Sequence, residues 1–146
     1  MTPLVVLTVG LIVAADAHKD DAANKELEKF QGTWKYVSVE VEGKQQSEGF
    51  AKSTLVIKGN QWTVSEGDKI VAQNTIKLDP TKKLKRIDLT STMDSDKGRR
   101  IRGIYTLEGD KFTMCDRGVD KGKRPAKFGT QPESGLVLVV LQRVKP

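Results

Sequence analysis

The chain has few of the side chains on which most catalytic and metal sites depend. Its 146 residues include one cysteine, Cys115, and one histidine, His18. One cysteine excludes an intramolecular disulfide, and one histidine on a polar N-terminal stretch leaves no imidazole base for a Ser-His-Asp or Cys-His site further along. The two residues are also too few for the usual zinc sites of cysteine and histidine. We therefore expect no catalytic residues, no metal, no cofactor and no enzymatic activity.

No apolar run in the N-terminal stretch is long enough to span a bilayer as a helix. Residues 1–17 (MTPLVVLTVGLIVAADA) contain the short run Leu4–Val13, and Ala15-Asp16-Ala17 after it is a cleavage-site pattern. We predict that residues 1–17 are a signal peptide. Its removal would leave no stable membrane anchor and an exported protein, periplasmic or extracellular. Because this stretch has no Lys or Arg, an uncleaved anchor and a misassigned start remain alternatives.

Acidic residues are outnumbered by basic ones. The chain has 25 Lys and Arg against 19 Asp and Glu, and loss of Asp16 leaves 18 (19 minus 1), a formal charge of +7 (25 minus 18). The excess lies in three stretches, 82–86, 97–102 and 117–127. A basic surface suits an anionic polymer or a protein partner. Aromatic residues are not interleaved with it as on single-strand nucleic-acid surfaces, so we expect no nucleic-acid partner.

Short runs rich in Val, Ile, Thr and Leu follow from Trp34 onward. They recur about every ten residues and are separated by Gly, Asp, Asn and Pro, which is typical of strands joined by tight turns. The predicted strands are Trp34–Glu42, Thr54–Lys58, Trp62–Ser65, Lys69–Leu78, Arg86–Met93, Arg99–Leu107, Lys111–Cys115, a weak one at Ala126–Phe128, and Leu136–Val144.

Alternation within these runs gives most strands one apolar face. Such strands must curl around a single core, and closure of the sheet removes its open edges. We therefore predict an all-β fold for residues 30–146, an antiparallel up-and-down meander closed into a small barrel of about eight strands, with a β-sandwich as the alternative. Residues 18–29 form a polar segment with a short helix at Ala22–Lys29. The last strand is apolar on both faces, which suggests that the N-terminal segment covers its outer side.

The start of the first strand carries a recognisable motif. Gly32-Thr33-Trp34 resembles the Gly-x-Trp motif of lipocalins and other calycins, in which the tryptophan closes the narrow end of the barrel and an arginine of the last strand lies across its ring. Arg143, in LQRVKP, stands at the matching place. A guanidinium stacks well on an indole and donates to nearby carbonyls. The resemblance implies that Gly32, Trp34 and Arg143 form a barrel-closing structural set.

Nearly all of residues 27–146 resembles a family of small exported lipocalin-like domains that is expanded in planctomycete bacteria. The resemblance rests on four blocks in order: LEKFQGTWKYVSVEVEGK, IKLDPTKKLKRIDLT, GIYTLEGDKFTMC and SGLVLVVLQRVKP. The function of that family is uncharacterised. The resemblance therefore implies a lipocalin-like barrel and export, and it implies no activity.

Inward-facing positions that combine apolar, small and polar side chains are candidates for a ligand pocket. Ala72 and Gly103 leave room, while Asn74 and Ser91 are polar and need partners. The full set is Trp62, Ala72, Asn74, Ser91, Met93, Gly103, Tyr105 and Met114. The alternative is that these residues only fill the core.

The longest connection, residues 116–135, is rich in basic residues. Long loops at the rim of a barrel often carry binding residues. Its candidates for contact with an anionic partner are Arg117, Lys121, Lys123, Arg124 and Lys127. A flexible, solvated lid is the alternative.

Two functions remain open at this point. The first is a non-catalytic exported binding module, a monomer that holds a small hydrophobic or amphipathic ligand in the barrel. The second is a filled barrel that binds a protein, as an inhibitor would, or an anionic envelope polymer through its rim loops and basic face. A solvent-accessible cavity favours the first, and binding that weakens steeply with salt favours the second.

Overall fold

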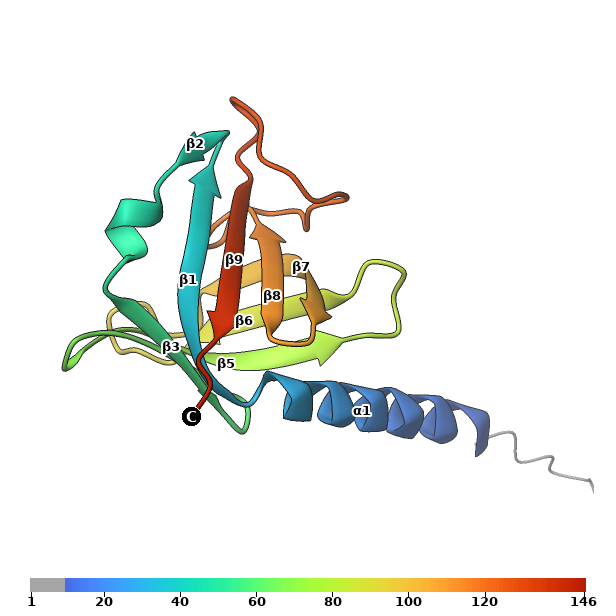
Figure 1. The fold of residues 1–146 in the computed structure, drawn as a ribbon. Coiled ribbons are helices and arrows are strands. Elements are labelled where there is room, and N and C mark those ends of the chain that lie inside the picture. The colour runs from blue at the N-terminus through green and yellow to red at the C-terminus, as the bar shows by residue number, and fades with distance from the viewer. Residues whose placement is uncertain (1–9) are drawn as a thin grey trace, which may run out of the picture.

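The computed structural model describes the backbone of residues 10–146 and the side chains of residues 18–146. Over these residues it has one α-helix, α1 (Gly10–Phe30), and a 3-10 helix, η1 (Ser47–Phe50) (Figure 1). The strands are β1 (Gly32–Val41), β2 (Lys44–Gln45), β3 (Ser53–Lys58), β4 (Gln61–Glu66), β5 (Lys69–Asp79), β6 (Arg86–Ser91), β7 (Arg100–Glu108), β8 (Lys111–Asp116) and β9 (Val137–Arg143). The predicted signal peptide falls on residues outside this description, apart from the backbone of 10–17, and stays a prediction.

The strands form a closed antiparallel barrel. Each strand from β3 to β8 pairs with the next, and β1 pairs with both β3 and β9, which closes the sheet. β2 is an additional two-residue strand paired with the end of β1 at Glu40 and Val41. The predicted fold, a small lipocalin-like barrel of eight strands with an N-terminal helix, is confirmed.

Alternating side chains and tight turns produce this meander. In β3, Leu55 and Ile57 are buried while Val56 between them is exposed, and β4 and β6 follow the same period of two. Gly59 joins β3 to β4 with a φ of 60°, a conformation that glycine adopts without the steric cost of a side chain. The sequence therefore specifies both the faces and the hairpins of the barrel.

The connection between β8 and β9 differs from the prediction. Ala126–Phe128 is not a strand, and Pro125 just before it is buried and has no N–H for a ladder. Phe128 instead packs against the outer cluster of Ile104, Cys115 and Leu136. The second apolar face of β9 is thus covered by this loop through Leu138, and not by the N-terminal segment as its sequence suggested.

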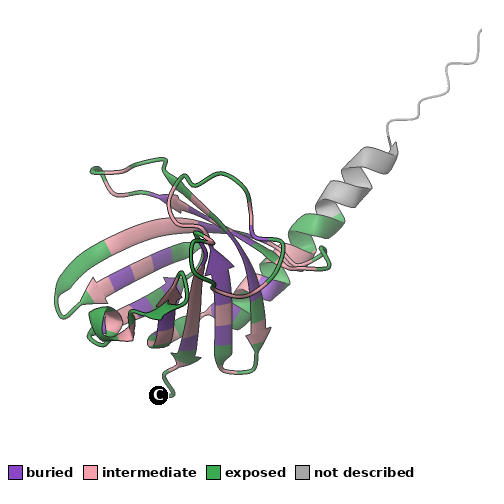
Figure 2. Cartoon of the chain, turned by 90° about the horizontal axis from the view of Figure 1, so that it is seen from above, coloured by how far each residue is buried: buried purple, intermediate pink, exposed green. Residues whose placement is uncertain are grey.

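Helix α1 lies across one end of the barrel, here called the α1 end (Figure 1). It begins at Gly10, well before the expected start at Ala22. Among its described side chains, Glu26 and Phe30 are buried and Leu27 packs on the core, a spacing that places all three on one face. Most of the remaining described helix is exposed (Figure 2). Within residues 10–146, no helix is both long and apolar enough to cross a membrane.

Aromatic rings fill the α1 end of the barrel. Phe112 makes edge-to-face contacts with Phe30, Trp34, Trp62 and Tyr105, with ring centroids 4.9 to 6.3 Å apart. Around these rings lie buried aliphatic side chains from β3, β5 and β6. Any internal space must therefore lie toward the opposite end, here called the open end.

Candidate functional site

A cavity of about 330 Å³ occupies the open half of the barrel. Eight strands of the barrel and η1 contribute to its wall, and the side chains are mostly apolar. The lining residues are Tyr36, Phe50, Ser53, Trp62, Val64, Glu66, Val71, Ala72, Asn74, Leu89, Ile101, Met114, Asp116, Val139 and Leu141. Because all of these positions except Phe50 lie on paired strands, the wall is formed by the fold itself.

The floor and the rim of the cavity are set by strand register. The floor, above the filled α1 end, is formed by Trp62 and Leu141. The Trp62 ring contacts the Phe112 ring, and Leu141 of β9 pairs with Phe112 of β8. Ser53 pairs with Glu66 at the other end of β3 and β4. Glu66 and Val71 are exposed there, so the cavity reaches solvent at the open end.

One side of the rim is built by η1. β1 pairs with β3 only from Gly32 to Lys35, so the second half of β1 separates from β3. The segment after β2 covers this gap, where Ser47 Oγ accepts from the Val39 N–H at 3.1 Å. Phe50 then lies against Tyr36 with ring centroids 5.2 Å apart. Both rings face the cavity.

The cavity contains a buried carboxyl group. Asp116 ends β8, is 6% exposed, and accepts a 2.6 Å hydrogen bond at Oδ1 from the Gly118 N–H. Burial raises the pKa of Asp116 to about 6, although the Gly118 bond opposes the shift. Burial also raises the pKa of Tyr36 to about 12, so its phenol is neutral at physiological pH. The polar side chains that line the cavity are therefore acidic or neutral.

Half of the predicted pocket residues line this cavity, and half lie elsewhere. Trp62, Ala72, Asn74 and Met114 line it. Ser91 is buried, but its hydroxyl bonds to the Asp96 carboxylate in the β6–β7 connection, and Met93 lies in that connection beyond the strand.

The other two predicted pocket positions, Gly103 and Tyr105, belong to packed regions. At Gly103 a Cβ would lie 2.9 Å from the Cys115 carbonyl oxygen and 3.0 Å from Met114 Cε, so neighbouring atoms use the space that the glycine leaves. Tyr105 is 1% exposed at the α1 end, where its hydroxyl donates to Glu26 Oε1 at 3.1 Å. Both residues face inward, but their positions along the barrel axis lie where side chains fill the interior.

Sequence reasoning missed several lining residues. Asp116 could have been predicted from the alternation in β8, because it follows Phe112 and Met114 on the same face of the strand. Phe50 could not have been predicted in this way, since it lies on a 3-10 turn outside every alternating run. Glu66 closes a strand at the rim and reads in sequence as an ordinary turn residue.

The Gly-x-Trp region closes the α1 end. Trp34 is fully buried, and its Nε1 donates to the Phe30 carbonyl at 2.9 Å. Arg143 lies across the indole, with Cζ 4.3 Å from the ring centroid, and donates to the carbonyls of Lys29 and Gln31. At Gly32, with a φ of 126°, a Cβ would come within 3.3 Å of Arg143 Nη1. Gly32, Trp34 and Arg143 thus meet at one place.

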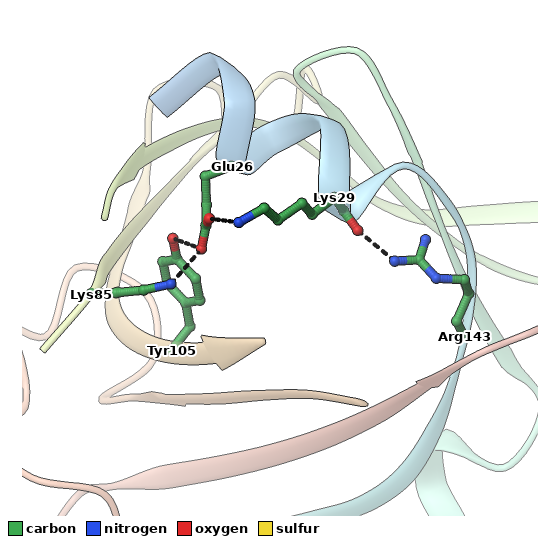
Figure 3. Close-up of polar contacts among 5 residues, drawn as sticks. All are labelled: Glu26, Lys29, Lys85, Tyr105 and Arg143. Atoms are coloured by element: carbon green, nitrogen blue, oxygen red, sulfur yellow. Dashed lines mark hydrogen bonds and ion pairs between the residues drawn. The ribbon is translucent and has the colours of Figure 1, made fainter. Parts of the chain in front are cut away.

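A cluster of ion pairs around the buried Glu26 carboxylate joins α1 to the barrel beside this closure (Figure 3). Glu26 accepts from Lys85 at 2.8 Å, from Lys29 at 3.0 Å and from the Tyr105 hydroxyl. Burial alone would raise the pKa of Glu26, but the bonds from Lys85 and Lys29 outweigh it and hold the pKa below its usual value. Every carboxylate oxygen has a donor, so this cluster is structural.

Basic residues gather in a second depression, outside the barrel, which we call the basic hollow. It has a volume of about 230 Å³, and its basic members come from β7 and the loop after β8. They are Arg100, Arg102, Arg117, Lys121 and Lys123. Asp120 fixes the loop here by accepting from Arg99 Nε and from the Arg100 N–H, both at 3.0 Å. Three of the five predicted loop cations therefore lie together, joined by two arginines of β7 that the prediction left out.

The other two predicted loop cations lie outside the basic hollow. Arg124 turns toward the barrel wall, where it pairs with Asp88 at 2.8 Å and donates to the carbonyls of Ile87 and Gly103. Lys127 is exposed, and its carbonyl accepts from the Cys115 thiol. Arg124 therefore holds the loop in place.

No protein-family model matches the chain, and neither a curated protein nor a solved structure shows significant similarity to it. Among the described side chains, no group of three or more His, Cys, Asp or Glu residues is arranged to hold a metal ion. Function has to be inferred from the cavity and the surface of the molecule itself.

Proposed function

We propose that this protein is a non-catalytic binding module that carries a small hydrophobic or amphipathic ligand in the open half of its barrel. One observation carries the proposal, the cavity of about 330 Å³ with apolar walls and a few polar groups. Sites for small molecules usually have this composition and measure about 300–1,000 Å³. The cavity is at the small end of that range, so it suits a compact ring system better than a long acyl chain.

The construction of the barrel supports this function. The aromatic cluster fills the α1 end, and α1 covers it, so a ligand enters from the open end alone. The walls are paired strands, which need little ordering when a ligand binds. We include export and membership of the planctomycete-type lipocalin-like family in the proposal, on the strength of residues 1–17 and the four sequence blocks.

The experiment that tests the proposal fills the cavity from within. Ala72→Phe adds a ring at a lining position, and Val56→Phe adds the same ring on the outer face of β3 as the matched control. We expect calorimetry to show that the wild type and Val56→Phe bind a neutral apolar compound such as tryptophol, and that Ala72→Phe binds at least about tenfold more weakly. Equal binding by all three proteins would place the compound outside the cavity and contradict the proposal.

A second candidate function is supported by the basic hollow. Arg100 and Arg102 lie beside Lys121 and Lys123, and all four are exposed, so an anionic polymer or an acidic protein segment is a suitable partner. The test is binding of dextran sulfate at increasing salt, with neutral dextran as the control polymer. Arg102→Gln with Lys121→Gln should weaken binding and flatten its salt dependence, whereas Lys44→Gln with Lys69→Gln, the same charge change elsewhere, should leave the salt dependence unchanged.

A further inference from the structure

Asp116 is a buried carboxyl group that the fold leaves without a cation. The residue is 6% exposed and lines the cavity, on the same inward face of β8 as Met114. Its one hydrogen bond among the described residues comes from the Gly118 N–H. No Lys, Arg or His among residues 18–146 forms an ion pair with it. A buried carboxylate without a counter-charge is costly, so its position in a cavity needs a reason.

Among the described side chains, the other buried acid, Glu26, shows the contrast. Glu26 has similar exposure, 4%, but it pairs with both Lys85 and Lys29 and also accepts from Tyr105. Even the arginine next to Asp116 is directed elsewhere, because Arg117 donates to the Ser134 carbonyl and lines the basic hollow. The protein thus neutralises its structural buried acid and leaves the acid in the cavity available.

The charge of the cavity is opposite to that of the molecule. The chain carries a net charge of +6, yet the ionisable lining residues are Asp116, Glu66 and the neutral Tyr36, and the described lining includes no Lys or Arg. Aromatic faces of Trp62, Tyr36 and Phe50 complete the wall. Carboxylates beside aromatic faces form a site that recognises ammonium groups, through ion pairing and cation–π attraction.

We propose that the cavity selects a compact amphipathic amine, whose ammonium group pairs with the Asp116 carboxylate while its apolar body lies against Trp62, Met114 and Leu141. This inference rests on the proposed binding function and adds the chemical class of the ligand. An ammonium supplies the counter-charge that Asp116 lacks, and a neutral ligand of the same shape does not. An anionic ligand would meet two carboxylates and is disfavoured.

The pH dependence of binding follows from the groups that face Asp116. These are Glu66 from β4 and Tyr36 from β1 among the ionisable lining residues, and Tyr36 does not titrate in the physiological range. With a pKa of about 6, Asp116 is mostly ionised at neutral pH and becomes protonated in mild acid. Affinity for an amine should therefore fall as pH decreases through about 6, because the protonated carboxyl no longer offers a negative charge.

The test compares three compounds that share one ring system and arm length. Tryptamine, tryptophol and indolepropionate carry an ammonium, a hydroxyl and a carboxylate, and each is titrated into the full chain by calorimetry. We expect tryptamine to bind about tenfold more tightly than tryptophol, and indolepropionate to bind most weakly. Asp116→Asn, which keeps an oxygen to accept from Gly118, should reduce tryptamine to the level of tryptophol. Asp94→Asn, the same charge change on an exposed loop residue, should leave tryptamine unchanged.

The outcomes separate this inference from the proposed function. If tryptamine and tryptophol bind equally, or if Asp116→Asn binds tryptamine as the wild type does, the amine inference is overturned and the apolar cavity stands. If none of the three binds, both are overturned. If Asp116→Asn does not fold, the pH dependence of binding to the wild type tests the inference instead. The affinity for tryptamine must then fall about tenfold from about pH 7.5 to about pH 5, while the affinity for tryptophol stays constant. Parallel pH profiles would overturn the inference.

Discussion

Trp34 combines three kinds of contact in one side chain. Its ring is fully buried against Phe112, its Nε1 donates to the Phe30 carbonyl, and the Arg143 guanidinium covers its face. Trp34→Ala should lower the free energy of unfolding by about 3–5 kcal/mol, the usual cost of truncating a buried large aromatic. Urea unfolding monitored by circular dichroism measures the change. A loss well below about 1 kcal/mol would contradict this account of the closure.

Arg143 should be energetically coupled to Trp34. The guanidinium also bonds Asp110 and the carbonyls at the end of α1, so Arg143→Ala is expected to destabilise by itself. Since each side chain loses the other's contact when mutated, a double-mutant cycle should give a coupling energy of about 0.5 kcal/mol or more. Additive single and double mutants would show that the stacked contact contributes nothing to stability.

Asp116 should make the protein more stable in mild acid. Its folded pKa of about 6 lies above the usual aspartate value, so the folded state binds a proton more tightly than the unfolded state between these two values. Stability from this group therefore rises as pH falls, by about 1 kcal/mol from about pH 7.5 to about pH 5. Urea midpoints of the wild type and Asp116→Asn at both pH values measure the effect. Equal pH dependence in the two proteins would mean that Asp116 titrates normally.

At the scale of elements, the loop between β8 and β9 acts as a second layer outside the barrel. Phe128 packs against the cluster of Ile104, Cys115 and Leu136, of which the first two would otherwise expose apolar surface on β7 and β8. Phe128→Ala should cost about 1–3 kcal/mol, less than a fully buried phenylalanine, because the side chain is only half-buried. Val37→Ala on the exposed face of β1 is the control and should change stability by less than about 0.5 kcal/mol. A change for Phe128→Ala as small as that of the control would show that the loop does not cover the strands in solution.

The period of two in the strands explains which elements could be predicted. It assigns a residue to the inner or outer face, and this was sufficient for the barrel, its hairpins and the inward positions of Trp62 and Met114. It carries no information on height along the barrel axis. Tyr105 faces inward like Met114 but lies at the end that Phe30 of α1 fills. Which inward residues line the cavity therefore depends on where the helix docks, a long-range contact without a local pattern.

Side chains of irregular segments were beyond sequence reasoning for a related reason. Arg124 belongs to a basic run that reads as a solvated loop, yet it bonds two carbonyls and Asp88 of the barrel wall. Phe50 reaches the cavity rim because β1 and β3 separate after four paired positions. Both placements follow from how the closed sheet positions its connections, and such positions are not encoded by neighbouring residues alone.

At the scale of the whole molecule, the two ends of the barrel differ in packing, and the cavity inside the barrel differs in charge from the outer surface. Aromatic packing and the Glu26 cluster close the α1 end, whereas the open half keeps a cavity that contains the buried Asp116 carboxyl group. The outside is basic, and the basic hollow lies outside the barrel. Binding inside the cavity should therefore depend weakly on salt, because a buried ion pair is poorly screened, whereas binding at the hollow should weaken steeply.

Native mass spectrometry tests the central claim most directly. The full chain is incubated with a lipid and metabolite extract, desalted gently and compared with the Ala72→Phe and Val56→Phe variants. A cavity of about 330 Å³ predicts a retained mass of a few hundred daltons on the wild type and Val56→Phe, and its loss from folded Ala72→Phe. A retained mass that persists in Ala72→Phe, or folded protein without any retained mass in all three, would contradict the account of the barrel as a ligand carrier.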